Sequence, residues 1–126
     1  MKKVLYVSGT RADYGPFRST LQAINTSPML DLSILVTGMH LLPRYGTTLH
    51  EIERDGFKIA AQVPMAVEGS TGTVMAMSMG LGMIGMAQAL ERIAPDQVIV
   101  LGDRTEMLAA AIVASHVNIP VVHVCG

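Results

Sequence analysis

A doubly wound α/β fold with a parallel sheet is what the sequence predicts. Apolar runs of strand length alternate along the chain with segments of helical period. The runs near Val4, Leu32 and Val98 are almost continuously hydrophobic, as in strands that helices cover on both faces. At 126 residues, half of them hydrophobic, the chain is long enough for one buried core, and no internal repeat, low-complexity tract or linker divides it.

Five strands are expected, each a short run of apolar and β-branched residues. Because helical segments separate them, the strands should lie parallel. Their ranges are Val4–Ser8, Leu32–Thr37, a weaker run near Lys58–Val63, Gln97–Leu101 and Val121–Val124.

The first helix is expected behind Pro16, a residue suited to the first helical position, with Phe17, Leu21 and Ile24 on one face. Asp13 should cap this helix. Further helices are expected at about Thr47–Arg54, along a methionine-rich segment to about Ile93, and at about Thr105–His116.

The methionine-rich segment allows two interpretations. Gly69–Leu90 carries no formal charge and is long enough to cross a bilayer, but its glycines, hydroxyl residues and Gln88 disfavour lipid, and no aromatic or basic cluster marks either end. A buried helix of a protein without a membrane span is therefore favoured, and a methionine-lined partner surface is the alternative. The residues that share the helical spacing are Met75, Met79, Met83 and Met86.

Charge and cysteine content narrow the function classes. A net charge of -1 with 15% charged residues excludes a disordered tail and a strongly basic nucleic-acid binder, so a small molecule or another protein is the expected partner. The single cysteine, Cys125, excludes an intrachain disulfide scaffold, suits a reducing cytoplasm and is expected to be buried. No metal site is indicated, because the four histidines are scattered without ligand spacing.

Polar residues gather where the predicted strands end. In parallel sheets, ligands bind beyond the carboxyl ends of the strands, near helix N-termini. There Gly9 would let a backbone approach a phosphate, and Arg11 offers a planar fork of donors for its oxygens. His40 follows the second strand, and His123 lies in the last, where it could equally be a core histidine.

The strongest acid/base candidate follows the fourth strand. Asp103, Arg104 and Glu106 fall within four positions at a strand end. An ordinary helix N-cap at Asp103, with Arg104 as its salt-bridge neighbour, explains the same residues equally well.

Five segments together resemble the hydrolysing UDP-N-acetylglucosamine 2-epimerases of sialic acid biosynthesis. They agree in order and spacing over the whole chain. The segments are Gly9–Tyr14, Thr37–Leu41, Ile52–Phe57, Val100–Met107 and Ile119–Val124. The resemblance implies the Rossmann-like N-terminal half of a glycosyltransferase-B fold, over residues 1–126, with the nucleotide-binding C-terminal domain absent from this stretch of sequence.

The resemblance also implies a reaction and its residues. UDP-N-acetylglucosamine and water would give N-acetylmannosamine and UDP, through loss of UDP and addition of water to a glycal, with no cofactor. Asp103 would be the catalytic acid/base, while the possible contributors Asp13 and Glu106 have no settled role. The substrate-binding residues would be Gly9, Thr10, Arg11, His40, Arg104 and His123.

Two departures from the family pattern keep alternatives open. The second carboxylate of the family would lie just past Gly126, and some relatives have Glu where this chain has Cys125. A non-hydrolysing epimerase typically resembles Gly-Asp-Thr at Gly102–Arg104, and an epimerase of a related nucleotide-sugar or a non-catalytic nucleotide-sugar-binding module would share the fold. From residues 1–126 alone we expect little turnover, and self-association as a homo-oligomer.

Overall fold

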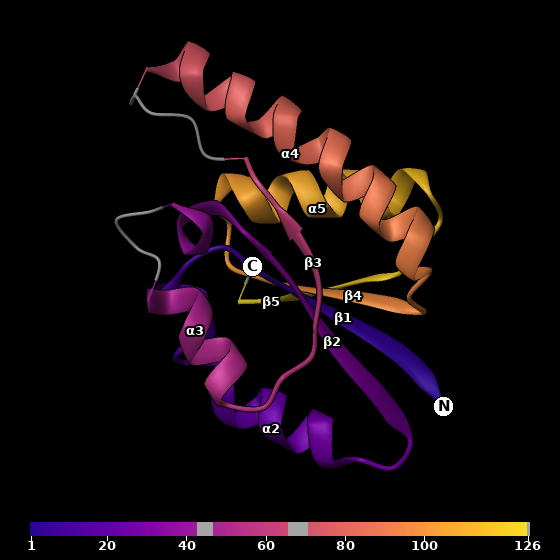
Figure 1. Cartoon of the computed structure of the whole chain (residues 1–126). Coiled ribbons are helices and arrows are strands. Elements are labelled where there is room, and N and C mark those ends of the chain that lie inside the picture. Colours follow the sequence, from indigo (N-terminus) through magenta and orange to yellow (C-terminus); the bar gives the residue numbers. More distant parts are fainter. Residues whose placement is uncertain (43–46, 66–70, 126) are drawn as a thin grey trace.

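The computed structural model describes residues 1–42, 47–65 and 71–125, which form a five-stranded parallel sheet between two layers of helices (Figure 1). The strands lie in the order β3-β2-β1-β4-β5. From β1 the chain adds β2 and β3 on one side and then β4 and β5 on the other, so the strand order reverses between β1 and β4. The predicted fold class and all five strands are confirmed. Their bounds are Lys2–Ser8 (β1), Leu30–Thr37 (β2), Ile59–Val63 (β3), Gln97–Leu101 (β4) and Val121–Val124 (β5).

The 3-10 turn η1 (Gly38–Leu41) was not expected, and the α-helices agree with the prediction except near the N-terminus. There the chain first forms a four-residue helix, α1 (Arg11–Tyr14), which was not expected, and the helix predicted behind Pro16 begins at Arg18. Asp13 therefore does not cap the helix near Pro16, because it is the third residue of α1 and shares a capping box with Thr10. The others are α2 (Arg18–Thr26), the 3-10 turn η1 (Gly38–Leu41), α3 (Thr47–Arg54), α4 (Gly72–Ile93) and α5 (Thr105–His116).

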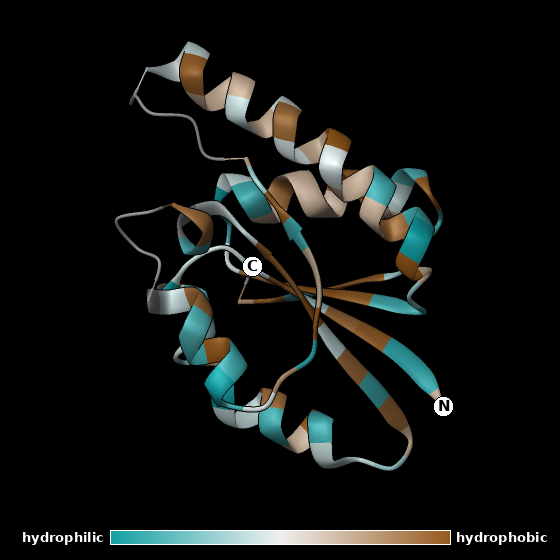
Figure 2. Ribbon diagram, viewed as in Figure 1, coloured by the Kyte–Doolittle hydropathy of each residue, from teal (hydrophilic) through white to brown (hydrophobic). Residues whose placement is uncertain are grey.

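Two hydrophobic clusters hold the layers together, because successive side chains of a strand point to opposite faces of the sheet. Leu5, Val7 and Val98 face α4 and α5, whereas Tyr6 and Ile34 face α2 and α3. The central strands are hydrophobic along most of their length in Figure 2. This double burial explains why the strands read as nearly continuous apolar runs.

The methionine-rich helix α4 is buried along one side only. Met86 is buried, Met79 and Met83 are partly buried against the core, and Met75 is half exposed. The outer side carries exposed Met77, Leu81 and Ile84. Helix α4 contains a stretch with the length and the mean hydropathy, 1.4, of a membrane span, and 22% of that stretch is buried in the structure. The prediction of a buried helix thus holds for its inner side, while residues 69–70 lie outside the described residues.

Candidate functional site

The loop after β1 is built around a buried carboxylate. Asp13 accepts hydrogen bonds from the Ser8 hydroxyl (2.6 Å) and from the backbone N–H groups of Gly9 (2.9 Å) and Thr10 (3.0 Å). Burial raises the pKa of Asp13, the three hydrogen bonds oppose that rise, and the nearby charge of Glu106 adds to it. The side chain of Asp13 thereby fixes the backbone of the loop after β1, which the sequence predicts to bind phosphate.

His40 is also buried, with both ring nitrogens engaged. Ser8 Oγ lies 2.9 Å from Nε2, and Thr48 Oγ1 lies 2.8 Å from Nδ1. Because the one hydroxyl hydrogen of Ser8 goes to Asp13, Nε2 is the donor toward Ser8, and Nδ1 of a neutral ring accepts from Thr48. Burial lowers the pKa of His40 to about 4, with the charge of Arg11 acting in the same direction. His40 is therefore neutral at pH 7 and ties the β1 loop to α3.

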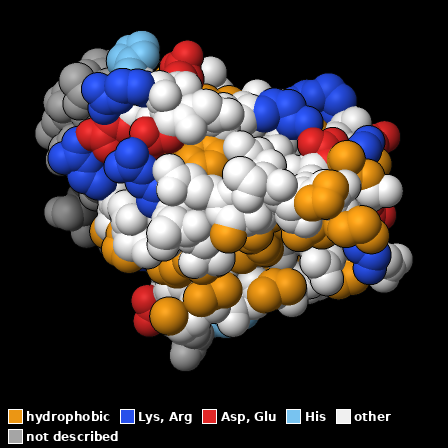
Figure 3. Space-filling model, turned by 90° about the horizontal axis from the view of Figure 1, so that it is seen from below, with side chains coloured by type: hydrophobic (Ala, Val, Ile, Leu, Met, Phe, Trp, Pro, Cys, Tyr) orange, Lys and Arg blue, Asp and Glu red, His pale blue; other side chains and the backbone are white. Residues whose placement is uncertain are grey.

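Arg11 lies on the exposed side of the same loop. Its guanidinium forms an ion pair with Glu51 of α3, while about 63% of its side chain stays accessible. Arg18 of α2 pairs in the same way with Asp55, at 2.9 Å. In the view of Figure 3, basic and acidic side chains lie beside one another at one end of the molecule. Arg11 is thus partly neutralised but open to a ligand.

Three loops meet at Glu106, in the first turn of α5. A Cβ added to Gly9 would lie 2.7 Å from Oε2 of Glu106, and one added to Gly38 would lie 3.3 Å from its Cγ. Gly38 also has φ +61°, a left-handed conformation that favours glycine. The glycines after β1 and β2 therefore make the space in which this carboxylate is buried.

The loop after β4 presents the predicted acid/base residue to solvent. Asp103 is exposed, and it has no hydrogen bond or ion pair with another described residue. Arg104, not Asp103, is the N-cap residue of α5, and its Nε donates to Glu106 Oε2 at 3.0 Å. The helix-capping explanation of Asp103, with Arg104 as its salt-bridge partner, is therefore wrong.

Strand β5 supports this loop. Nε2 of His123 lies 2.7 Å from the carbonyl oxygen of Gly102, and Gly102 N–H donates to the carbonyl of Val124 at 2.9 Å. His123 is exposed and is not a core histidine. Cys125 is exposed as well, so the expectation that it is buried is wrong. Gly126 lies outside the described residues.

The fold brings the predicted residues to one edge of the sheet. Arg11 follows β1 and Asp103 follows β4, and these two strands are parallel neighbours. The order of strands reverses here, which is where doubly wound sheets bind their ligands. Two arginines and an unpaired carboxylate suit a ligand that combines anionic oxygens with a group that gains or loses a proton. No group of three possible metal ligands occurs among residues 1–42, 47–65 and 71–125.

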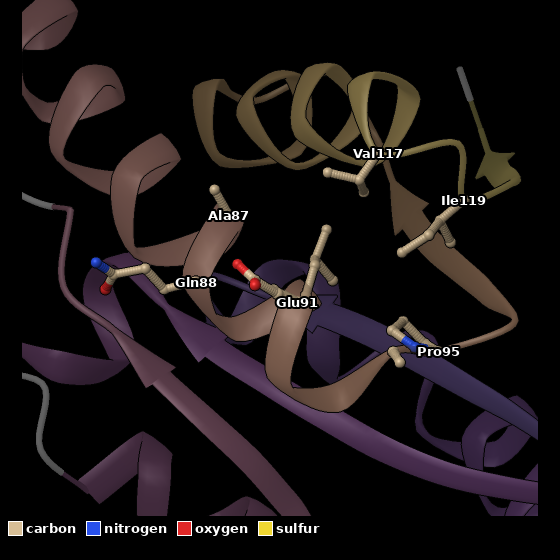
Figure 4. Close-up of a pocket in the computed structure, with 8 residues that line it drawn as sticks. Ala87, Gln88, Glu91, Pro95, Val117 and Ile119 are labelled. Atoms are coloured by element: carbon tan, nitrogen blue, oxygen red, sulfur yellow. The ribbon is translucent and has the colours of Figure 1, made fainter.

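A separate hollow of about 460 Å³ lies at the opposite edge of the sheet (Figure 4). Its lining comes from the C-terminal end of α4 and from the segments that lead into β4 and β5, including Leu90, Pro95 and Ile119. Apart from Glu91 and Gln88 this lining is apolar or small. The hollow is therefore distinct from the polar edge that carries Arg11 and Asp103.

Sequence reasoning missed Ser8, Thr48 and Glu51, which hold His40 and Arg11. Their partners are 32, 8 and 40 positions away in the chain, and no local pattern connects them. The only signal was the helical spacing of Thr48 and Glu51, which places both on one side of α3.

Residues 22–126 match the family described as UDP-N-acetylglucosamine 2-epimerase. The whole chain is 48% identical to a UDP-N,N'-diacetylbacillosamine 2-epimerase (hydrolyzing) from Legionella pneumophila and covers 33% of it. It is 40% identical to the polysialic acid biosynthesis protein P7 of Escherichia coli and covers 32% of that protein. The chain thus spans about a third of the length of these curated relatives.

Solved structures share the fold. A UDP-GlcNAc 2-epimerase from Neisseria meningitidis, bound to UDP-GlcNAc, superposes with a TM-score of 0.79 at 21% identity, over 96% of this chain and 31% of that one. A UDP-GlcNAc 2-epimerase from Methanocaldococcus jannaschii, in complex with UDP-GlcNAc and UDP, gives a TM-score of 0.77 at 24% identity, over 96% and 32% of the two chains.

Proposed function

The chain belongs to the UDP-N-acetylglucosamine 2-epimerase family, and we propose that the complete protein is a hydrolysing epimerase that forms N-acetylmannosamine and UDP from UDP-N-acetylglucosamine and water. The observation that carries the proposal is the Gly-Asp-Arg loop at the reversal of strand order, with Asp103 unpaired among the described residues and Arg104 and Arg11 on the same edge. The description of the Legionella relative as hydrolyzing supports the same choice.

The reaction needs an acid/base group and positive charge. The proton on C2 of the sugar is not next to a carbonyl, so it becomes acidic only as UDP departs and positive charge develops at C1. Asp103, which is exposed at the edge, would remove that proton to leave a glycal. Arg11 and Arg104 would bind the departing diphosphate, and water would then add to C1 with a proton delivered to the opposite face of C2.

The other predicted residues have supporting parts in this proposal. Gly9 and Thr10 would bring the loop after β1 close to the diphosphate, in the backbone conformation that Asp13 fixes by accepting both of their N–H groups. His40 would contribute to substrate binding by supporting the loop after β1, since its two ring nitrogens are engaged by the hydroxyl groups of Ser8 and Thr48. His123 would hold the loop that carries Asp103.

Product analysis tests the proposal. The complete protein, incubated with UDP-N-acetylglucosamine, should release free N-acetylmannosamine and UDP. A product still attached to UDP would indicate a non-hydrolysing epimerase, and binding without turnover would indicate a nucleotide-sugar-binding module. Asp103→Asn should lower kcat about a hundredfold or more. Asp31→Asn is the matched control, because Asp31 pairs with Lys58 at the opposite end of β2.

A related sugar is the second candidate substrate. The Legionella relative, 48% identical, is named for a UDP-linked 2,4-diacetamido sugar. The same assay with that substrate would separate the two, because the better substrate has the higher kcat/KM.

We also propose that the complete protein is a homo-oligomer without nucleic-acid or membrane partners, located in the cytoplasm. Support for self-association comes from the outer side of α4, where Met77, Leu81 and Ile84 are each more than half exposed. Exposed apolar side chains gathered on one helix are typical of protein interfaces.

A further inference from the structure

We propose that Glu106 is a positioning residue that holds Arg104 in place for the diphosphate and keeps it away from Asp103. This inference rests on the proposed function for the identity of the ligand. It gives Glu106 a role other than acid/base catalysis or a general interaction with the helix dipole.

The burial of Glu106 separates it from an ordinary residue of a first helical turn. A carboxylate in the first turn stabilises a helix from the surface, in water. The side chain of Glu106 is only 10% exposed, and its oxygen lies against Gly9. Burying a carboxylate is costly unless a partner compensates it. Among the described residues, the partner that the structure provides is Arg104.

The geometry of the pair leaves the useful part of Arg104 accessible. The bond to Glu106 Oε2 uses the Nε–H of the guanidinium, at 3.0 Å. The two terminal amino groups, which form the fork that binds phosphate oxygens, have no partner in the described part of the chain. About 47% of the Arg104 side chain is exposed, so the fork is held at one angle beside solvent.

The Arg104–Glu106 pair also keeps Arg104 from forming an ion pair with Asp103. Asp103 is the sequence neighbour of Arg104, and a flexible arginine would be drawn toward it. With Arg104 bound to Glu106, Asp103 has no ion pair among the described residues. An unpaired carboxylate remains available to accept a proton, whereas one paired with arginine would be a poorer base.

The test compares Glu106 variants that keep or remove the acceptor oxygen. Glu106→Gln retains an oxygen for Nε–H, whereas Glu106→Asp is too short to reach it and Glu106→Ala has none. We expect the dissociation constant for UDP to stay within about threefold of wild type in Glu106→Gln and to rise about tenfold in Glu106→Asp and Glu106→Ala. Arg104→Ala should show the same rise, and the double variant Glu106→Ala with Arg104→Ala should be no worse than Arg104→Ala alone. The matched control is Glu91→Gln, at the opposite edge of the sheet.

Titration calorimetry with UDP and with inorganic pyrophosphate measures binding without turnover, so the outcome does not depend on the reaction that the enzyme catalyses. The ¹⁵Nε–H signal of Arg104 gives a second measurement, and it should be protected from exchange in wild type and Glu106→Gln but not in Glu106→Asp. Equal loss of turnover in all three Glu106 variants with unchanged UDP binding would make Glu106 an acid/base residue and overturn the proposal. Additive losses in the double variant would overturn it as well. Failure of the proposed function would be seen separately, as UDP binding without product.

Discussion

Acid should destabilise this protein through His40, which is buried beneath the β1 loop with both ring nitrogens hydrogen-bonded. The unfolded histidine titrates near pH 6.5, and the folded one near pH 4. Because the folded pKa lies below the unfolded one, the unfolded state binds more protons between these values, and the folded state loses about 1.4 kcal/mol for each pH unit. Stability is therefore intact above pH 6.5, falls by about 2 kcal/mol at pH 5, and by about 3 kcal/mol at pH 4.

Urea denaturation of wild type and His40→Gln at pH 7, 6 and 5 measures this effect, because glutamine does not titrate. The pKa of Asp13 is raised by burial, so protonation of Asp13 favours the folded state as pH falls, but both proteins retain Asp13 and the comparison cancels it. His50→Gln is the control, since the His50 ring stays largely in water on α3. If wild type and His40→Gln lose the same free energy of unfolding between pH 7 and 5, the reasoning is refuted.

Three further outcomes are expected. Gly38→Ala should lower the free energy of unfolding by about 1–3 kcal/mol, because the φ of Gly38 is +61° and the new Cβ would meet the Gly9 carbonyl. Gly80→Ala, where a Cβ would meet nothing on α4, should raise it by about 0.5–1 kcal/mol. Thermal unfolding measures both, and equal effects of the two substitutions would contradict this reasoning. Arg11→Ala should weaken UDP binding about tenfold by calorimetry, and an unchanged dissociation constant would remove Arg11 from the site. Ile84→Glu should convert an oligomer into a monomer in sedimentation velocity, and an unchanged sedimentation coefficient would exclude the outer side of α4 as the interface.

The strands and most helices followed from the sequence because the signals that specify them are local. β2 and β4 are runs of apolar residues that are buried on both faces, and such runs have one reasonable interpretation between helical segments. The range predicted for helix α5, about Thr105–His116, matches its observed bounds, with Glu106 in its first turn and Asn118 beyond its end. The short helix α1 was not predicted because four residues give too little periodicity to detect, and Asp13, which forms the capping box of α1 with Thr10, was expected to cap the later helix.

The candidate site followed from the sequence only as a set of residues at strand ends. That Arg11 and Asp103 share an edge is a consequence of parallel strand order, which the alternation of strands and helices already implies. Which side chains pair there depends on loops brought together from distant parts of the chain. Glu106 rather than Asp103 receives Arg104 because Gly9 and Gly38 leave room for the Glu106 carboxylate. His40 is neutral because burial lowers its pKa, and Ser8 and Thr48 are the hydroxyl partners of its buried ring. Such contacts require the folded chain, since hydrogen bonds and burial between residues far apart in sequence leave no local pattern.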